Sequence, residues 1–157
     1  MKRCFQSESE QETIAIGSKL GALLKGGEVV ELVSDVGGGK TTITKGIVAG
    51  CDSSDLVSSP TFTVSNVYSG AKLDIHHYDF YRIGELGLMS EELQEVLESR
   101  SAISVIEWAG EASNMLPSDR VIRITLSRDM NGEDVRNIGI EYPDSMASLG
   151  AIGGKEC

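Results

Sequence analysis

A glycine-rich segment between an apolar run and a helix-forming run constrains this chain most strongly. Residues 28–34 read EVVELVS and are typical of a buried strand, whereas residues 40–49 read KTTITKGIVA and fit a helix. Between the two runs lie three consecutive glycines, 37–39, which a Lys-Thr pair follows directly. A glycine-rich turn from strand to helix that ends in Lys-Thr is typical of a P-loop, in which backbone N–H groups surround phosphate. The segment therefore predicts nucleotide binding.

The residues after the glycines have separate tasks in such a loop. Lys40 would bridge the β- and γ-phosphates of a nucleotide, and the Thr41 hydroxyl would ligate Mg²⁺. One position departs from the pattern G-x-x-x-x-G-K-[ST], because Ser34 stands where the first glycine is expected. The alternative is a glycine-rich turn that binds nothing, but such a turn has no need of Lys-Thr at its end.

A P-loop enzyme also needs carboxylates at the ends of neighbouring strands, to hold the water shell of the metal or to orient an attacking water. Glu107 ends the apolar run that begins at Ile103, and Asp79 ends the more polar run that begins at Ile75. Both acids are therefore candidate site residues. The alternative for each is a solvated strand end, because most acids in proteins are exposed.

Two further residues are candidates because of their place in the sequence. Thr61 follows Ser59-Pro60 at the point where a loop that senses the γ-phosphate would lie, although the same residues also fit the start of a strand. Trp108 directly follows Glu107, and both contact with a nucleotide or partner and burial in the core remain open for it.

Adjacent histidines at positions 76 and 77 suggest a metal or an acid–base role at first sight. Neighbouring residues on a strand point to opposite faces, so His76 and His77 are poorly placed to share one metal ion. Packing or surface exposure is therefore the favoured interpretation of this pair.

Strands and helices alternate along the rest of the sequence. Ser9 and Glu12 have the spacing of a capping box, which predicts a helix that ends at Gly26-Gly27. The other expected elements are a strand at residues 3–6, a hairpin within 61–80, a helix at 85–99, a strand at 103–108 and a hairpin within 121–142. Together they predict an α/β protein with one domain over residues 1–143. Residues 144–157 are small and glycine-rich, so we expect a flexible tail there.

The charge balance excludes one class of function. The chain has 157 residues, with 14 Lys and Arg against 24 Asp and Glu, and a formal net charge of −10. A protein that binds nucleic acid through its own surface needs clustered cations, so any contact with RNA would come through a partner. The sequence also has no apolar run near the roughly 18 residues that span a bilayer, so we expect a cytoplasmic protein without a membrane partner.

The three cysteines, Cys4, Cys51 and Cys157, are odd in number and widely spaced. None belongs to a pair or cluster with the spacing of a zinc site. We therefore expect reduced thiols without a structural or metal role.

Four segments in combination resemble one family. They are SDVGGGKTT from Ser34, SPTFT from Ser59, HHYDFYR from His76 and VIEW from Val105. At these spacings the chain, from about Glu10 to Pro117, resembles the TsaE family of bacterial ATPases in tRNA threonylcarbamoyladenosine biosynthesis. The resemblance implies a three-layer P-loop NTPase-like fold with a mixed parallel and antiparallel sheet, ATP and Mg²⁺ as ligands, and a weak ATPase that assembles with TsaB and TsaD.

The resemblance also assigns roles to single positions. Lys40, Thr61, Asp79 and Glu107 are implied as catalytic residues, with Thr41 and Glu107 as the magnesium ligands. Trp108 corresponds to the tryptophan beside the metal acid. The residues implied to contact the nucleotide are Glu10, Val36, Gly37, Gly38, Gly39, Lys40, Thr41 and Thr42.

Two other functions share the P-loop and remain open. A small-molecule kinase would transfer the γ-phosphate to a hydroxyl, and it would need basic residues at an acceptor site, for which Arg82 and Arg100 are few. A nucleotide-gated binding module would use ATP to order the segment near Thr61, with hydrolysis incidental. Transfer of phosphate to a metabolite would favour the kinase, and partner binding that does not need hydrolysis would favour the module.

Overall fold

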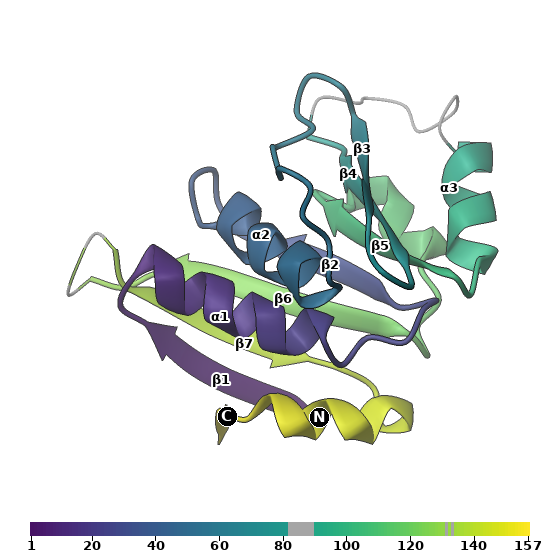
Figure 1. Cartoon of the computed structure of the whole chain (residues 1–157). Helices are drawn as coiled ribbons and strands as arrows, with labels where there is room; N and C mark the ends of the chain where they lie inside the picture. The colour runs from purple at the N-terminus through teal and green to yellow at the C-terminus, as the bar shows by residue number, and fades with distance from the viewer. Residues whose placement is uncertain (82–89, 131, 133) are drawn as a thin grey trace.

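The structure, a computed structural model, describes residues 1–81, 90–130, 132 and 134–157 (Figure 1). In chain order the elements are β1 (Lys2–Ser7), α1 (Glu10–Gly21), β2 (Val29–Val33), α2 (Lys40–Gly50), β3 (Ser65–Ser69), β4 (Asp74–Asp79), α3 (Ser90–Glu98), β5 (Ala102–Glu107), the 3-10 helix η2 (Gly110–Met115), β6 (Val121–Arg128), β7 (Arg136–Glu141), the 3-10 helix η3 (Asp144–Ile152) and β8 (Lys155–Glu156). Residues 85–89 of the helix expected at 85–99 lie outside the described residues.

All strands belong to one sheet in the order β3-β4-β5-β2-β6-β7-β1-β8. The four neighbours β4, β5, β2 and β6 run parallel to one another. The outer strands β3, β7, β1 and β8 pair antiparallel with their neighbours. The expectation of an α/β fold with a mixed sheet is therefore confirmed.

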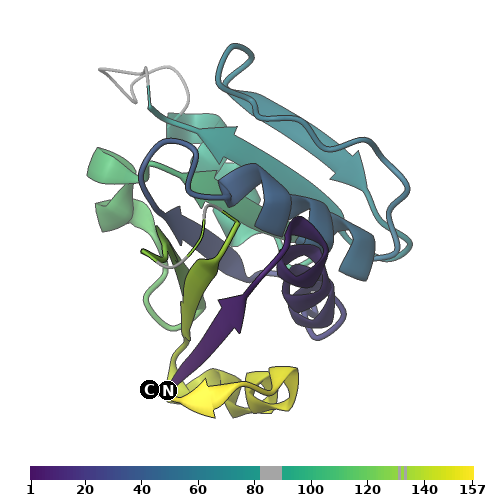
Figure 2. The same ribbon diagram turned by 90° about the vertical axis from the view of Figure 1, so that its left-hand side faces the viewer.

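Helices cover both faces of this sheet, which gives three layers (Figures 1 and 2). On one side, α1 and α2 bury a core that includes Ile43 and Ile47 of α2 with Val105 of β5. On the other side, α3 and η2 pack over a smaller core that includes Ile106. Because Val105 and Ile106 are consecutive, they point to opposite faces, and β5 is buried on both.

Glycines allow α1 and α2 to lie in close contact. A Cβ added to Gly21 would stand 2.2 Å from the Ile47 carbonyl oxygen, and one added to Gly46 would stand 2.3 Å from the Ile14 carbonyl oxygen. No side chain fits at such distances, so the two backbones touch directly. This contact fixes α2, whose first residue is Lys40, against α1.

The start of α1 is as predicted, and its end is not. The Ser9 hydroxyl accepts a hydrogen bond from the Glu12 amide at 3.2 Å, as an N-cap should. The helix ends at Gly21 rather than at Gly26-Gly27. Beyond it, the Glu28 carboxylate accepts from the amides of Lys25 at 2.9 Å and Gly26 at 2.7 Å. These bonds hold the chain in a turn instead of a further helical turn.

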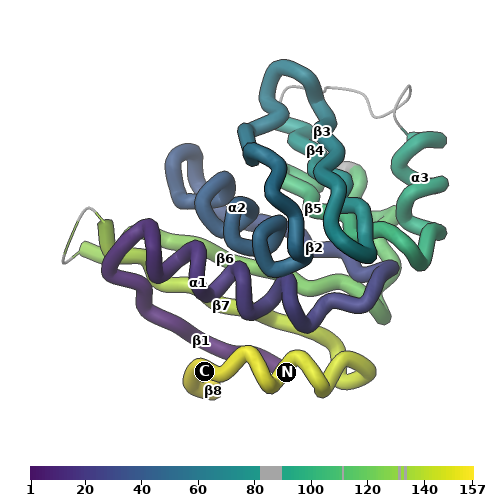
Figure 3. The backbone as a smooth tube through the Cα atoms, in the orientation of Figure 1, coloured from purple at the N-terminus to yellow at the C-terminus, as the bar shows by residue number. Residues whose placement is uncertain are grey.

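The segment after Pro143 differs from the expected flexible tail. Residues 144–152 form η3, and Leu149 and Ile152 are buried in the core beside α1. The last residues then pair with β1, so both termini lie side by side (Figures 1 and 3). The few apolar residues of this segment were sufficient to pack it, because they meet an apolar face that the sheet had left uncovered.

The expectation of three reduced thiols is wrong for two of the cysteines. Cys4 of β1 and Cys157 form a disulfide across 153 residues of sequence. The antiparallel pairing of β1 with β8, in which Cys4 faces Lys155, brings the two sulfurs together. Cys51 is a buried free thiol. Among the described residues, no helix is long and apolar enough to cross a membrane.

Candidate nucleotide-binding site

A pocket of about 430 Å³ opens where β2, β4 and β5 end and α2 begins. Parallel strands place their carboxyl ends at one edge of a sheet, which is where ligands bind in such folds. Ten of the candidate residues named above line the pocket, together with Ser59 and Tyr81. The ten are Val36, Gly37, Gly39, Lys40, Thr41, Thr42, Thr61, Asp79, Glu107 and Trp108.

The glycine-rich loop has the backbone shape of an anion cradle. Gly37 and Gly39 have φ angles of 73° and 110°, in the left-handed region that favours glycine. Gly39 is also the N-cap of α2, and because glycine has no side chain, it makes no side-chain cap to the amides of the first turn. These amides, together with the positive end of the helix dipole, are available to a phosphate.

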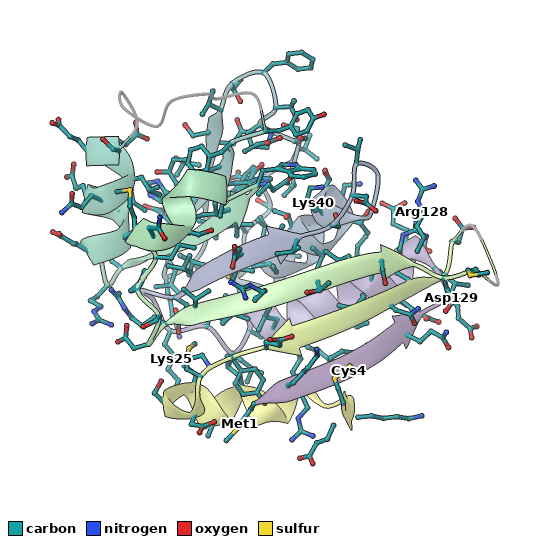
Figure 4. All side chains as sticks on the ribbon, turned by 180° about the vertical axis from the view of Figure 1, so that it is seen from behind. Met1, Cys4, Lys25, Lys40, Arg128 and Asp129 are labelled. Carbon is teal, nitrogen blue, oxygen red and sulfur yellow. A yellow bond between two sulfur atoms is a disulfide. The ribbon has the colours of Figure 1, made fainter. Side chains whose placement is uncertain are left out.

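Lys40 is 7% exposed and its ammonium is held inside the loop. Its Nζ donates to the Ser34 carbonyl oxygen at 3.4 Å, to Ser34 Oγ at 3.1 Å and to the Asp35 carbonyl oxygen at 3.2 Å. The same Nζ lies 4.6 Å from the centre of the Trp108 ring, a cation–π distance. Figure 4 shows Lys40 among the side chains at this edge of the sheet, near the end of β6 that carries Arg128.

The two predicted carboxylates are neighbours. Asp79 and Glu107 are the last residues of β4 and β5, and the parallel register pairs them directly. Asp79 is 5% exposed and Glu107 is 3% exposed, so neither is a solvated strand end. Asp79 accepts at Oδ2 from the Thr61 hydroxyl at 2.7 Å and at Oδ1 from the Tyr81 amide at 2.9 Å.

A tight turn presents Thr61 to Asp79. The Val64 amide donates to the Pro60 carbonyl oxygen at 2.6 Å, and the Asp79 amide donates to the Val64 carbonyl oxygen at 3.0 Å. Val64 has a φ of 71°, which is strained for a β-branched residue. Strain of this kind persists where the surroundings fix it, and here the Thr61–Asp79 bond is one of the fixing contacts.

His77 lies beneath Glu107, a contact that the sequence did not reveal. Its side chain is fully buried, and its Nε2 lies 2.9 Å from Glu107 Oε1. A carboxylate can only accept, so Nε2 donates and fixes the orientation of Glu107. His77 Nδ1 lies 3.3 Å from the Tyr68 hydroxyl, which is also 3.0 Å from the Ser58 carbonyl oxygen. Strand alternation could have predicted that His77 is buried, but only the register between β4 and β5 gives its partner.

Two of the expected nucleotide contacts lie outside the pocket lining. The Glu10 carboxylate is on the surface and pairs with Lys45 of α2 at 3.0 Å. Gly38 is buried against the Ser34 side chain. The contact of these residues with a nucleotide remains a prediction. Arg82, which bears on the kinase alternative, lies outside the described residues.

The oxygen atoms at the pocket suit magnesium. Among the described residues, no cluster of three or more His, Cys, Asp or Glu side chains could hold a metal ion unaided. Mg²⁺ is commonly bound by one or two carboxylates with phosphate oxygens and waters, rather than by protein groups alone. A hydroxyl at Thr41 and carboxylates at Asp79 and Glu107 line one cavity with the phosphate loop, which fits a nucleotide-bound Mg²⁺.

Comparisons with known proteins agree with this geometry. The family model for the threonylcarbamoyl adenosine biosynthesis protein TsaE matches residues 7–138. Proteins named tRNA threonylcarbamoyladenosine biosynthesis protein TsaE are similar to this chain. The one from Bacillus subtilis is 35% identical over 85% of this chain and 82% of its own length. The one from Treponema pallidum is 34% identical over 83% of this chain and 96% of its own length.

A solved structure agrees as well. The crystal structure of YdiB from Bacillus subtilis superposes with a TM-score of 0.75 at 28% sequence identity, over 95% of this chain and 91% of that one. A match at this level over nearly the whole of both chains means a shared fold and not only a shared loop. The P-loop, the paired carboxylates and the matched span lead to one conclusion, that this chain belongs to the TsaE family.

Proposed function

We propose that this chain binds ATP with Mg²⁺ and hydrolyses it as a component of the machinery that makes threonylcarbamoyladenosine in tRNA. One observation carries the proposal: a phosphate loop, Lys40 and two buried carboxylates on adjacent parallel strands line the same pocket. Membership in a family named for this biosynthesis supplies the process. Neither the loop nor the acids alone would distinguish hydrolysis from binding.

Each residue has a distinct task in this proposal. The amides of the loop and of the first turn of α2 bind phosphate oxygens, and Lys40 neutralises the charge that develops between the β- and γ-phosphates. Thr41 and Glu107 would hold Mg²⁺, which supplies further charge neutralisation when bound. His77 keeps Glu107 oriented through the 2.9 Å hydrogen bond.

Asp79 and Thr61 connect the site to the loop at residues 58–64. Asp79 would orient a water molecule, and the position of its carboxylate in the pocket beside Glu107 supports this role. The hydroxyl of Thr61 now donates to that carboxylate at 2.7 Å. A ligand that takes the Thr61 hydroxyl would release Asp79, so the loop can respond to the contents of the site.

Partners belong to the same proposal. With a net charge of −10 the chain is poorly suited to hold tRNA by itself, so we place tRNA on TsaB and TsaD and give this chain the role of their ATPase. Hydrolysis would then drive a conformational or product-release step in the complex, and the isolated chain would hydrolyse slowly.

The test measures Mg²⁺-dependent ATP hydrolysis and tRNA modification by the purified chain, alone and with TsaB and TsaD from the same organism. We expect hydrolysis to rise when the partners are added and to vanish with Lys40→Ala. Lys72→Ala, an exposed lysine at the β3–β4 turn, is the matched control. Unchanged hydrolysis and modification in Lys40→Ala would overturn the proposal.

The Thr61–Asp79 hydrogen bond favours one second candidate, a binding module that ATP gates. In that case ATP binding alone would order the loop and recruit the partners. Full tRNA modification with a non-hydrolysable ATP analogue would select this candidate over the ATPase.

A further inference from the structure

In the part of the chain that the structure describes, the ammonium of Lys40 has a protein acceptor for each of its donors. An ammonium has three N–H donors, and Lys40 has three acceptors within 3.4 Å: two carbonyl oxygens and Ser34 Oγ. To reach a phosphate, Lys40 must therefore give up at least one of them. The shortest of the three contacts is the one to the Ser34 hydroxyl, at 3.1 Å.

Ser34 is fixed in this position by the loop itself. Its hydroxyl donates to the Asp35 carbonyl oxygen at 3.0 Å, which leaves a lone pair of Oγ directed at Lys40. On the other side, a Cβ added to Gly38 would stand 2.7 Å from Ser34 Cβ and 2.6 Å from Ser34 Oγ. Ser34 therefore fills the space over Gly38, and its hydroxyl contacts both the Asp35 carbonyl oxygen and Lys40.

We infer that Ser34 sets the nucleotide affinity of this chain by holding the Lys40 ammonium within the loop. A glycine at this position, as the P-loop pattern has it, offers no side-chain acceptor. The serine accepts a charge-assisted hydrogen bond from Lys40, for which a phosphate oxygen must compete. The inference rests on the proposed function, since it concerns the affinity of the same site, and it names the residue that tunes that affinity.

Ser34→Ala tests the inference because alanine removes the hydroxyl and keeps the Cβ that packs over Gly38. We expect the dissociation constants of ADP and ATP to fall about three- to tenfold, since the lost bond is charge-assisted but partly open to water. The change should be equal with Mg²⁺ and with EDTA, because the hydroxyl acts on Lys40 and not on the metal. Titration calorimetry measures the dissociation constants of ADP and ATP in the presence of Mg²⁺ and in the presence of EDTA.

Trp108 gives a readout that needs no nucleotide. It is the only tryptophan of the chain, and its ring lies 4.6 Å from Lys40 Nζ. Ser34→Ala should shift its emission in the empty protein, because Lys40 loses an anchor. The same substitution made in Lys40→Met should leave the emission of that variant unchanged, since the bond is already absent.

Ser127→Ala, an exposed serine of β6, is the matched control and should change neither affinity nor emission. Affinity that is unchanged or weaker in Ser34→Ala overturns the inference, and weaker binding would mean that the hydroxyl contacts the nucleotide. If the unaltered chain binds no nucleotide at millimolar concentration and Lys40→Ala behaves identically, the proposed function fails instead.

Discussion

The two halves of the sheet bury different kinds of residues. In the parallel half, the edge that carries the pocket buries charged groups, Lys40, Asp79 and Glu107, with the polar His77 beneath them. In the antiparallel half, the corresponding interior is apolar, with Ile138 and Ile140 of β7 among its members. A disulfide joins β1 to the C-terminal residue at the outer edge of this half (Figure 4).

This difference separates the pocket, where we expect activity to reside, from the joined termini, which we expect to contribute mainly to stability. Buried charges cost free energy of desolvation, which their mutual contacts offset only in part. Two residues near the pocket, Val64 and Trp108, also have positive φ angles, at 71° and 56°. We therefore expect substitutions in the pocket to change activity more than stability, and substitutions at the joined termini to do the reverse.

Among the substitutions that compare the two halves, Glu107→Gln should have the largest effect on activity. The substitution removes the charge that would hold Mg²⁺ in the proposed function, but it keeps an oxygen that can accept from His77 Nε2. We expect hydrolysis with the partners to fall by about 10²- to 10³-fold, as when one charge-stabilising group is lost from an active site. The midpoint of thermal unfolding should stay within a few degrees of the original or rise, because a buried charge is gone.

Thermal unfolding and the steady-state rate of ATP hydrolysis, both measured on the same preparation of Glu107→Gln, test this prediction. A variant that unfolds much earlier and loses activity in proportion would show that Glu107 is mainly structural, and the contrast between the two halves would fail.

Cys157→Ser should give the opposite pattern. A crosslink between residues 153 positions apart restricts the unfolded chain strongly, so we expect the free energy of unfolding to fall by about 2–4 kcal/mol. Nucleotide affinity should change less than twofold, since the disulfide lies at the far edge of the sheet from the pocket. Denaturant titration with and without a reducing agent measures the first effect, and the agent should affect only the unaltered protein.

Thiol labelling gives an independent check on the same bond. Burial, with the charges of Glu28 and Asp52, raises the pKa of Cys51 to about 11, so this thiol reacts slowly in the folded protein. Without a reducing agent, the unfolded chain should take up one alkyl group, at Cys51. Uptake of three groups would show that Cys4 and Cys157 are not joined.

The local sequence pattern was sufficient for the phosphate loop and for the strand ends that carry the two acids, although not for the end of α1, which lies at Gly21. Gly37 to Thr41 identified the loop, and the positions of Asp79 and Glu107 at strand ends followed from short apolar runs. These features need only a few adjacent residues and the rule that parallel strands end at one edge. The hairpin of β3 and β4 was predicted for the same reason.

What the sequence did not reveal depends on long-range pairing. His77 and Glu107 are 30 residues apart, and only the parallel register of β4 and β5 makes them partners. Cys4 and Cys157 meet because the two-residue strand β8 joins the edge of β1, and so short a strand has no periodicity to detect. Glu10 pairs with Lys45 of the neighbouring helix, which no motif predicts.

Tyr68→Phe should have a smaller effect, confined to the pocket. The substitution removes only the hydroxyl between His77 Nδ1 and the Ser58 carbonyl oxygen. His77 then has one anchor fewer, and Glu107 becomes less well oriented. We expect kcat to fall about three- to tenfold, with the nucleotide dissociation constant in EDTA unchanged, because in the proposed function Glu107 would act through the metal.

Val67→Ala, in the same strand with a side chain 54% exposed, is the control for a general effect on β3. Weaker nucleotide binding in EDTA by Tyr68→Phe would show that the loop at residues 58–61, and not Glu107, carries the effect.

The smallest effect is expected from an exposed ion pair of the antiparallel half. The Lys2 ammonium lies 2.8 Å from the Glu141 carboxylate, and this hydrogen bond lowers the pKa of Glu141 below its usual value. A carboxyl whose pKa is lower in the folded state stabilises the fold above its unfolded pKa, and that contribution is lost as the pH falls through the folded pKa. Both side chains are nearly half exposed, so solvent screens the pair strongly.

We therefore expect Lys2→Met to lower the free energy of unfolding at pH 7 by at most about 0.5 kcal/mol. The difference should disappear as the pH falls through the lowered pKa of Glu141, and in about 1 M salt, where the Debye length is near 3 Å. Denaturant titrations at pH 7 and over a series of lower pH values measure it, with Lys72→Met at the opposite edge of the sheet as the control. A loss as large as that of Cys157→Ser would mean that surface charge, rather than the disulfide and apolar packing, stabilises this half of the sheet.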